Sequence, residues 1–312
     1  MSVYAIIIAL LLDFALGDPV LRWHPVRVLG YAAEALEVFC RKIHASARLQ
    51  GVVFLSLNIC LFIFSVSFIQ LIVSFSEPLS ALLDGVMIYF ALGGTCLARE
   101  VSNVAASFMR EGEEGAQTNL GMLVSRNVDG MGEEEISSSA IETLAENFSD
   151  SACATLFYAA IGGAPLAWLH RVVNTLDAMV GYRTEEYAEF GWASAQLDDV
   201  LNYLPARVSA IITAVVSPTV QGGVNRTLER ARLEGGALSS PNAGYPIAAF
   251  AGALGVKLCG PTRYFGVLKE KPFIGTGPRP GIADVMRALS LYWNAYAFAA
   301  AAAVALGWII RA

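Results

Sequence analysis

The chain has 312 residues, of which 55% are hydrophobic and only 15% are charged. Soluble globular chains carry about 25% charged residues. This composition excludes a disordered chain, a collagen, a coiled coil and a secreted disulfide scaffold. A net charge of -6 without a dominant basic stripe also argues against a nucleic-acid-binding domain.

Long uncharged stretches recur along the chain. Between Arg48 and Glu77 lie 28 uncharged residues, and a helix needs about 20 apolar residues to cross a bilayer. The sequence therefore predicts an all-α, polytopic integral membrane protein that forms one membrane-embedded domain over 1–312, with about five or six membrane helices or helical hairpins. The apolar segments are expected at about 1–16, 51–75, 79–98, 151–170, 208–225 and 288–310.

Basic residues predict which connecting regions face the cytoplasm. Five Lys and Arg residues occur in 17–50, three in 99–150 and nine in 226–287. The positive-inside tendency places 17–50 and 226–287 on the cytoplasmic side, and 99–150 joins them if 51–75 and 82–98 form a hairpin. We expect irregular loops in all three regions. Residues 1–16 lack a basic leader and a small-residue cleavage site, so we expect a retained membrane segment rather than a signal peptide.

A helical hairpin is predicted over residues 137–181, because Gly-Gly-Ala-Pro at 162–165 interrupts the stretch. Asp150 lies twelve residues before this turn and Asp177 lies twelve residues after it. At about 1.5 Å per residue, both carboxylates are expected about 18 Å from the turn and level with each other.

Residues 11–30, LLDFALGDPVLRWHPVRVLG, combine two Asp, two Arg and His24 with two prolines. Spacing alone explains them equally well as an interfacial turn, with arginines as cytoplasmic anchors and Trp23 in the aromatic belt. The density of charge on a backbone restricted by proline favours a loop that presents charges to a phosphate or a metal.

Carboxylates and amides gather beside the predicted hairpin. Glu142, Glu146 and Asp150 follow one helix face, and Asn174 and Asp177 share another. Ionised groups at the border of a membrane segment are costly and usually functional. Mg²⁺ takes oxygen ligands and is usually shared with substrate phosphates. We therefore predict metal or phosphate chemistry, while a cation-coupled transporter would use the same residue types.

A further helix is expected to hold Asp198, Asp199 and Asn202, and Pro205 is expected to break it before the apolar run at 208. The Gly- and Pro-rich region 235–281 cannot be one regular helix and offers backbone nests for anions. The sequence contains no P-loop, G-x-S-x-G or H-E-x-x-H motif. Its five cysteines are scattered and are expected to be small buried hydrophobes.

Five motifs occur in a fixed order: GDPVLRWHPVRVLG, IETLAENFSDS, GGAPLAWLHRVVNTLDAMVGY, GWASAQLDDVLNYLPARV and SSPNAGYPIAAFAGALGVKLCGP. This set resembles the adenosylcobinamide-phosphate synthase family of cobalamin biosynthesis (CbiB or CobD), from about residue 10 to residue 281. The resemblance implies an amide ligase that uses ATP and Mg²⁺ to join adenosylcobyric acid, a corrinoid, to (R)-1-aminopropan-2-ol O-phosphate, giving adenosylcobinamide phosphate. It also implies a multi-pass protein of the bacterial inner membrane with cytoplasmic site loops, which associates with other membrane enzymes of cobalamin assembly.

The resemblance also implies roles for individual residues. The expected catalytic residues are Glu146, Asp150, Asp177 and His24. Those expected to bind substrate or phosphate are Arg27, Arg126, Asn147, Asn174, Arg183, Asn202, Arg207 and Asn242. Mg²⁺ is expected at Asp150, Asp177, Asp198 and Asp199.

The chain departs from the family pattern at three positions, with Asn127, Thr155 and Gln196 where Asp, Pro and Arg are usual. The absence of Arg at position 196 argues against a phosphate contact there, and Asn127 weakens the case for a metal ligand in its loop. Two alternatives stay open. One is a cation-coupled transporter, and the other is a non-catalytic membrane protein related to the family.

Overall fold

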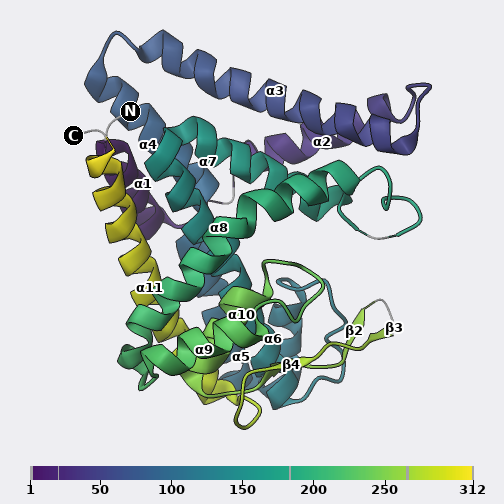
Figure 1. The fold of residues 1–312 in the computed structure, drawn as a ribbon, viewed down its shortest axis with the longest axis vertical. Helices are drawn as coiled ribbons and strands as arrows, with labels where there is room; N and C mark the ends of the chain where they lie inside the picture. The colour runs from purple at the N-terminus through teal and green to yellow at the C-terminus, as the bar shows by residue number, and fades with distance from the viewer. Residues whose placement is uncertain (1–2, 20, 183, 265–266, 311–312) are drawn as a thin grey trace. The chain divides into compact units, whose positions relative to one another are not determined.

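The computed structural model describes residues 3–19, 21–182, 184–264 and 267–310, which are mostly helical (Figure 1). The chain forms two compact units. Unit 1 comprises residues 1–93, 154–202 and 300–312, and unit 2 comprises residues 94–153 and 203–299.

Within the described residues, five helical segments are long and apolar enough to cross a membrane, at 47–73, 77–121, 133–180, 192–220 and 282–309. This confirms the predicted all-α, polytopic membrane fold. The predicted first segment, 1–16, is the shorter apolar helix α1 (Val3–Leu16).

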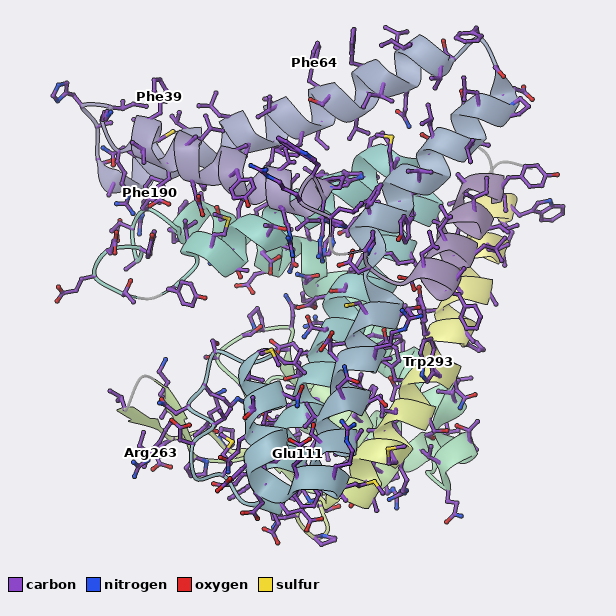
Figure 2. All side chains as sticks on the ribbon, turned by 180° about the vertical axis from the view of Figure 1, so that it is seen from behind. Phe39, Phe64, Glu111, Phe190, Arg263 and Trp293 are labelled. Atoms are coloured by element: carbon purple, nitrogen blue, oxygen red, sulfur yellow. The ribbon has the colours of Figure 1, made fainter. Side chains whose placement is uncertain are left out.

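Unit 1 is built on the pairing of α1 with α4 and of α2 with α3, while α7 contacts both α3 and α4. The complete helices of this unit, after α1, are α2 (Pro25–Cys40), α3 (Ala47–Val73), α4 (Glu77–Leu92) and α7 (Ala154–Val180). Most large apolar side chains of α3 are exposed, and Figure 2 shows Phe64 projecting outward from this helix. Such a surface is suited to lipid.

Unit 2 packs α5 against α6 and α9 against α10. Its elements are α5 (Gly94–Gly121), α6 (Glu133–Asn147), the π-helical turn η1 (Phe148–Cys153), the 3₁₀ turn η2 (Ser217–Val220), α9 (Val224–Glu234), α10 (Gly244–Leu254), β1 (Leu258–Cys259), β2 (Thr262–Tyr264), β3 (Val267–Lys269) and β4 (Phe273–Ile274). The short strands pair antiparallel, β1 with β4 and β2 with β3. Two further helices, α8 (Trp192–Val216) and α11 (Ile282–Ile309), contribute residues to both units.

Helix α7 folds back on itself at Gly163, which has φ 73° and ψ -157°, a conformation reserved for glycine. The rings of Tyr158 and His170 stack with their centroids 5.4 Å apart. Twelve residues of continuous helix would separate them by about 18 Å. The predicted hairpin is therefore confirmed around its turn, while the equal height of Asp150 and Asp177 stays a prediction.

Helix α5 contains a second fold-back that the sequence analysis did not predict. Gly112 has φ 72° and ψ -155°, nearly the same backbone conformation as Gly163. Across it, the side-chain amide of Asn119 donates to the hydroxyl of Ser107 at 2.8 Å, although the two residues are twelve positions apart. Both fold-backs are therefore helix pairs joined at one glycine.

The predicted break at Pro205 is wrong, because α8 continues through this proline from Trp192 to Val216. A proline inside a helix leaves the carbonyl four residues earlier without its usual donor. Here that carbonyl belongs to Leu201, and the hydroxyl of Tyr158 donates to it at 2.7 Å. A side chain from α7 thus replaces the missing backbone hydrogen bond.

Two of the regions predicted as irregular loops are largely helical. Region 17–50 contains α2, which begins with Pro25 in its first turn and with the His24 side chain accepting the Val26 amide at 3.3 Å. Proline suits the first turn of a helix because its missing donor has no partner there. Region 99–150 holds most of α5 and all of α6. Within the third region, 235–243 and 255–281 have the irregular form expected, and the second of these also contains short strands that were not predicted.

We expect Gly112→Ala to destabilise the protein by about 1–3 kcal/mol, the cost of forcing a non-glycine residue into this backbone conformation. An added Cβ would meet nothing within 4 Å there, so the loss would report backbone strain alone. Thermal unfolding in detergent measures it. Gly30→Ala is the control, because Gly30 is helical, lacks a positive φ and also has open space around a Cβ. Equal unfolding temperatures for the two variants would contradict the assignment.

Candidate functional site

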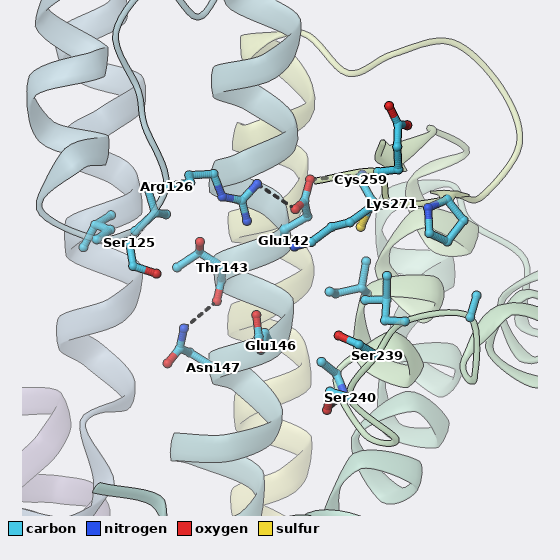
Figure 3. Close-up of a pocket in the computed structure, with 18 residues that line it drawn as sticks. Ser125, Arg126, Glu142, Thr143, Glu146, Asn147, Ser239, Ser240, Cys259 and Lys271 are labelled. Carbon is cyan, nitrogen blue, oxygen red and sulfur yellow. Dashed lines mark hydrogen bonds and ion pairs between the residues drawn. The ribbon is translucent and has the colours of Figure 1, made fainter. Parts of the chain in front are cut away.

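The buried carboxylate of Glu142 on α6 is the centre of a polar site in unit 2 (Figure 3). One oxygen accepts from Nη1 of Arg126 at 2.9 Å. The other accepts from the hydroxyl of Ser138 at 2.6 Å and from the backbone amide of Cys259 at 3.0 Å. Glu142 therefore connects α6 with the loop before it and with β1.

Cys259 is held from both sides in a left-handed backbone conformation, with φ 61°. Its amide donates to Glu142, and its carbonyl accepts from Nη1 of Arg279 at 2.8 Å. Burial raises the pKa of the Cys259 thiol, and the nearby Glu142 charge raises it further. The thiol is therefore protonated at neutral pH and is not a nucleophile.

A cavity of about 430 Å³ lies on one side of the Arg126–Glu142 pair. Of the two cavities that adjoin this ion pair, we call this one the larger cavity. Its polar lining includes Glu146 and Asn147 from α6 and the cations Arg126 and Lys271. In Figure 3, Ser239 and Ser240 approach from the loop before α10. Hydroxyls and cations suit phosphate oxygens, while carboxylate and amide oxygens suit a hard cation.

A second cavity, of about 340 Å³, shares Arg126, Glu142 and Cys259 with the first. We call it the smaller cavity. Its other charged lining residues are Arg263, Arg279, Asp129 and Glu135. The sequence analysis missed this site, because Asp129, Arg263 and Arg279 come from loops and a short strand that carry no periodic signal, although α6 supplies Glu135 and Glu142.

Two of the predicted phosphate-binding residues, Arg207 and Asn242, contact each other in unit 2. Nη1 of Arg207 donates to Oδ1 of Asn242 at 3.1 Å. The guanidinium lies 3.5 Å from the ring centroid of Tyr203 and 4.0 Å from that of Tyr245. Stacking against two rings orients the guanidinium.

A second polar group lies in unit 1, where α7 and α8 provide a chain of hydrogen bonds. The amides of Asn174 and Asn202 donate to the two oxygens of Asp198, at 3.3 and 3.0 Å. The Oδ1 of Asn202 lies 2.8 Å from Nε2 of His170. Because Oδ1 can only accept, His170 must be protonated at Nε2. His170 was not predicted, since a single histidine in an apolar run carries little signal.

Asp177 lies close enough to Asp198 and Asp199 to be affected by their charges. Among the described residues, however, no three carboxylate, imidazole or thiolate groups are arranged to hold a metal by themselves. Mg²⁺ usually binds through one or two carboxylates together with substrate phosphates and water. The oxygen donors present therefore fit a metal that arrives with a phosphate.

The motif at 11–30 forms a charged group in unit 1. Nε2 of His24 lies 2.8 Å from Oδ1 of Asp18. The hydrogen bond from His24 and the positive charges of His24, Arg171 and Arg27 hold the pKa of the Asp18 carboxyl below its usual range, although partial burial opposes the shift. Asp18 and Arg171 were not predicted as site residues.

The structure thus brings the predicted residues into separate groups. Arg126, Glu146 and Asn147 share the larger cavity, while Asp150 lies in η1 and is not part of its lining. Arg183 lies outside the described residues. The unit 1 group contains Asn174, Asp177, Asp198, Asp199 and Asn202.

Removing one partner of the buried Arg126–Glu142 pair leaves the other charge unpaired. We expect Glu142→Ala to lower the free energy of unfolding by about 3–5 kcal/mol. The double variant Arg126→Met with Glu142→Leu leaves no unpaired charge and is expected to lose less. Thermal unfolding in detergent compares them, and a double variant as unstable as Glu142→Ala would disprove the role of charge pairing.

Comparison with known proteins gives relatives over nearly the whole chain. The protein named "Cobalamin biosynthesis protein CobD" from Geobacter metallireducens is 40% identical to this chain, and the match covers 90% of this chain and 89% of the relative. The protein of that name from Clostridium perfringens is 37% identical over 90% of each chain. The one from Mycobacterium tuberculosis is 37% identical over 96% of this chain and 94% of its own. No solved structure matches.

The family model described as "CobD/Cbib protein" matches residues 6–292. This range contains both polar groups and both cavities. The chain belongs to the CobD/Cbib protein family.

Proposed function

We propose that the protein is a cobalamin-biosynthesis ligase that uses ATP to join adenosylcobyric acid to (R)-1-aminopropan-2-ol O-phosphate through an amide bond. The family and the names of its relatives support the pathway. The observation that carries the reaction type is the larger cavity, which combines cations for phosphate with carboxylate and amide oxygens.

The reaction requires activation of a carboxylate, which is a poor acyl donor. Transfer of the terminal phosphoryl group of ATP to the corrinoid propionate would form an acyl phosphate and ADP. The amine nitrogen then attacks the acyl carbon, the amide forms and inorganic phosphate leaves. The phosphates of ATP are anionic, so Lys271, beside the paired Arg126, is suited to bind them in the larger cavity.

The amine arrives as an ammonium ion and must lose a proton before it attacks. Glu146 is the proposed acceptor, because its carboxylate lies in the lining of the larger cavity. The adjacent Asn147 donates its amide to the Thr143 carbonyl at 3.0 Å, which orients the side chain along α6. His24 is a second proposed proton-transfer or orienting residue, held by Asp18 in unit 1.

Mg²⁺ is the proposed metal, and it would neutralise the phosphate charge during phosphoryl transfer. The residues proposed to hold it are Asp177, Asp198 and Asp199, which all lie in unit 1. The two amides that donate to Asp198 fix the orientation of its carboxylate, as outer partners of metal ligands do.

The proposed location is the bacterial inner membrane with the site residues on the cytoplasmic side. The apolar helices support a multi-pass membrane protein, and ATP is a cytoplasmic substrate. The nine basic residues of 226–287, which include Lys271, agree with that orientation.

A product assay tests the proposed reaction. Purified protein in lipid, supplied with Mg²⁺, ATP, adenosylcobyric acid and aminopropanol phosphate, is expected to release one ADP for each amide formed. Mass spectrometry detects the amide, and a coupled assay detects ADP. Folded protein that forms neither product would overturn the proposal, and substrate flux without an amide would favour a transporter.

The variant Asp177→Asn tests whether the Asp177 carboxylate takes part in the reaction or only stabilises the structure. Replacing a residue that only orients a metal ligand lowers activity roughly 10–100-fold. We expect kcat/KM of Asp177→Asn to fall by more than this. The unfolding temperature should stay constant or rise, because the substitution removes repulsion with Asp198 and Asp199. Glu185→Gln, which removes an exposed carboxylate just after α7, is the matched control with unchanged activity. Wild-type turnover in Asp177→Asn would exclude Asp177 from the reaction.

A further inference from the structure

The smaller cavity has a charge pattern different from that of a simple anion site. Arg126 and Glu142 on the shared wall neutralise each other at 2.9 Å. Two guanidinium groups, Arg263 and Arg279, and two carboxylates, Asp129 and Glu135, then remain in the lining. One Glu135 oxygen also accepts from the Gly132 amide at 3.2 Å. A purely anionic ligand would be repelled by the two carboxylates, and a purely cationic ligand would be repelled by the two arginines.

Several segments of unit 2 build this cavity, including α6, which supplies Glu135. The loop before α6 supplies Asp129, and β2 supplies Arg263. A backbone hydrogen bond from the amide of Asn127 to the carbonyl of Arg263, at 3.0 Å, joins the two segments. Nη1 of Arg279 is bonded to the carbonyls of Lys257 and Cys259, which fixes the position of its guanidinium. The Arg279 guanidinium is therefore fixed in place, while Asp129, Glu135 and Arg263 reach the cavity from exposed positions.

The size of the cavity limits its ligand. About 340 Å³ is near the lower end of the range for small-molecule pockets. A corrinoid macrocycle is far too large for it, and a short phosphorylated chain fits.

We propose that the smaller cavity binds a small zwitterion that carries a phosphate and an ammonium group. The phosphate would contact Arg263 and Arg279, and the ammonium would contact Asp129 and Glu135. This inference rests on the proposed function in one respect only, namely that such a molecule is the amine substrate. The ligand would lie directly across the Arg126–Glu142 pair from the larger cavity, so the two reacting groups would be neighbours.

Calorimetric binding to the full-length protein in detergent tests the site without turnover. The probes are ethanolamine phosphate, inorganic phosphate and Mg-ATP. Arg263→Ala is expected to weaken ethanolamine phosphate at least tenfold and to leave Mg-ATP within twofold. Lys271→Ala, in the larger cavity, is expected to do the reverse. Lys269→Ala removes one positive charge from the same hairpin outside both linings and should change neither.

The ammonium contact has its own test. Asp129→Asn is expected to weaken ethanolamine phosphate about tenfold while leaving inorganic phosphate, which has no ammonium, within twofold. Asp129 is exposed, so this substitution does not threaten the fold. Equal effects of Asp129→Asn on both probes, or equal effects of Arg263→Ala and Lys269→Ala, would overturn the assignment.

The outcome is separable from that of the proposed reaction. If the protein binds ethanolamine phosphate through Arg263 but forms no amide, the zwitterion site stands and the ligase proposal fails. If it forms the amide while Arg263→Ala leaves the KM for aminopropanol phosphate within twofold of wild type, the ligase stands and this site is wrong.

Discussion

Glu142 connects three segments of unit 2 through one carboxylate, and both cavities depend on this connection. Arg126 comes from the loop before α6, Ser138 from the preceding turn of α6, and Cys259 from β1. A buried carboxylate is tolerated only when its charge is paired and its oxygens accept hydrogen bonds. Because Cys259 is 117 residues from Glu142 in the sequence, pairing this one charge also positions the wall that the two cavities share.

The all-α membrane fold was predictable from the long uncharged stretches of the sequence. The turn of the α7 hairpin was predictable from Gly-Gly-Ala-Pro, because both are local signals. The Gly112 fold-back was not, since an isolated glycine in a polar helix carries no comparable signal. The break at Pro205 was predicted wrongly for a related reason. Whether a proline ends a helix depends on whether another element supplies the missing donor, and Tyr158 lies 47 residues earlier.

The site was predictable to a similar degree. Acidic and amide positions on helices followed from spacing, and Glu146 with Asn147 does line a cavity. The contribution of Lys271 and Arg263 could not be predicted, because residues 255–281 have no periodicity and their positions follow from strand pairing. His170 was missed for another reason. Its significance comes entirely from Asn202, whose amide must face Asp198 and whose oxygen must therefore face the imidazole.

The hydrogen bond between Tyr158 and Leu201 has a consequence for sequence change. Its donor is needed only because position 205 is proline, and the same tyrosine ring stacks on His170. Replacing Tyr158 by Phe would leave the Leu201 carbonyl without a hydrogen-bond donor inside a membrane helix. In a chain with alanine at 205, the backbone amide would supply that donor, and the same replacement would change the stability little. The two positions are therefore epistatic, and homologous chains should lose or retain the tyrosine hydroxyl and the proline together.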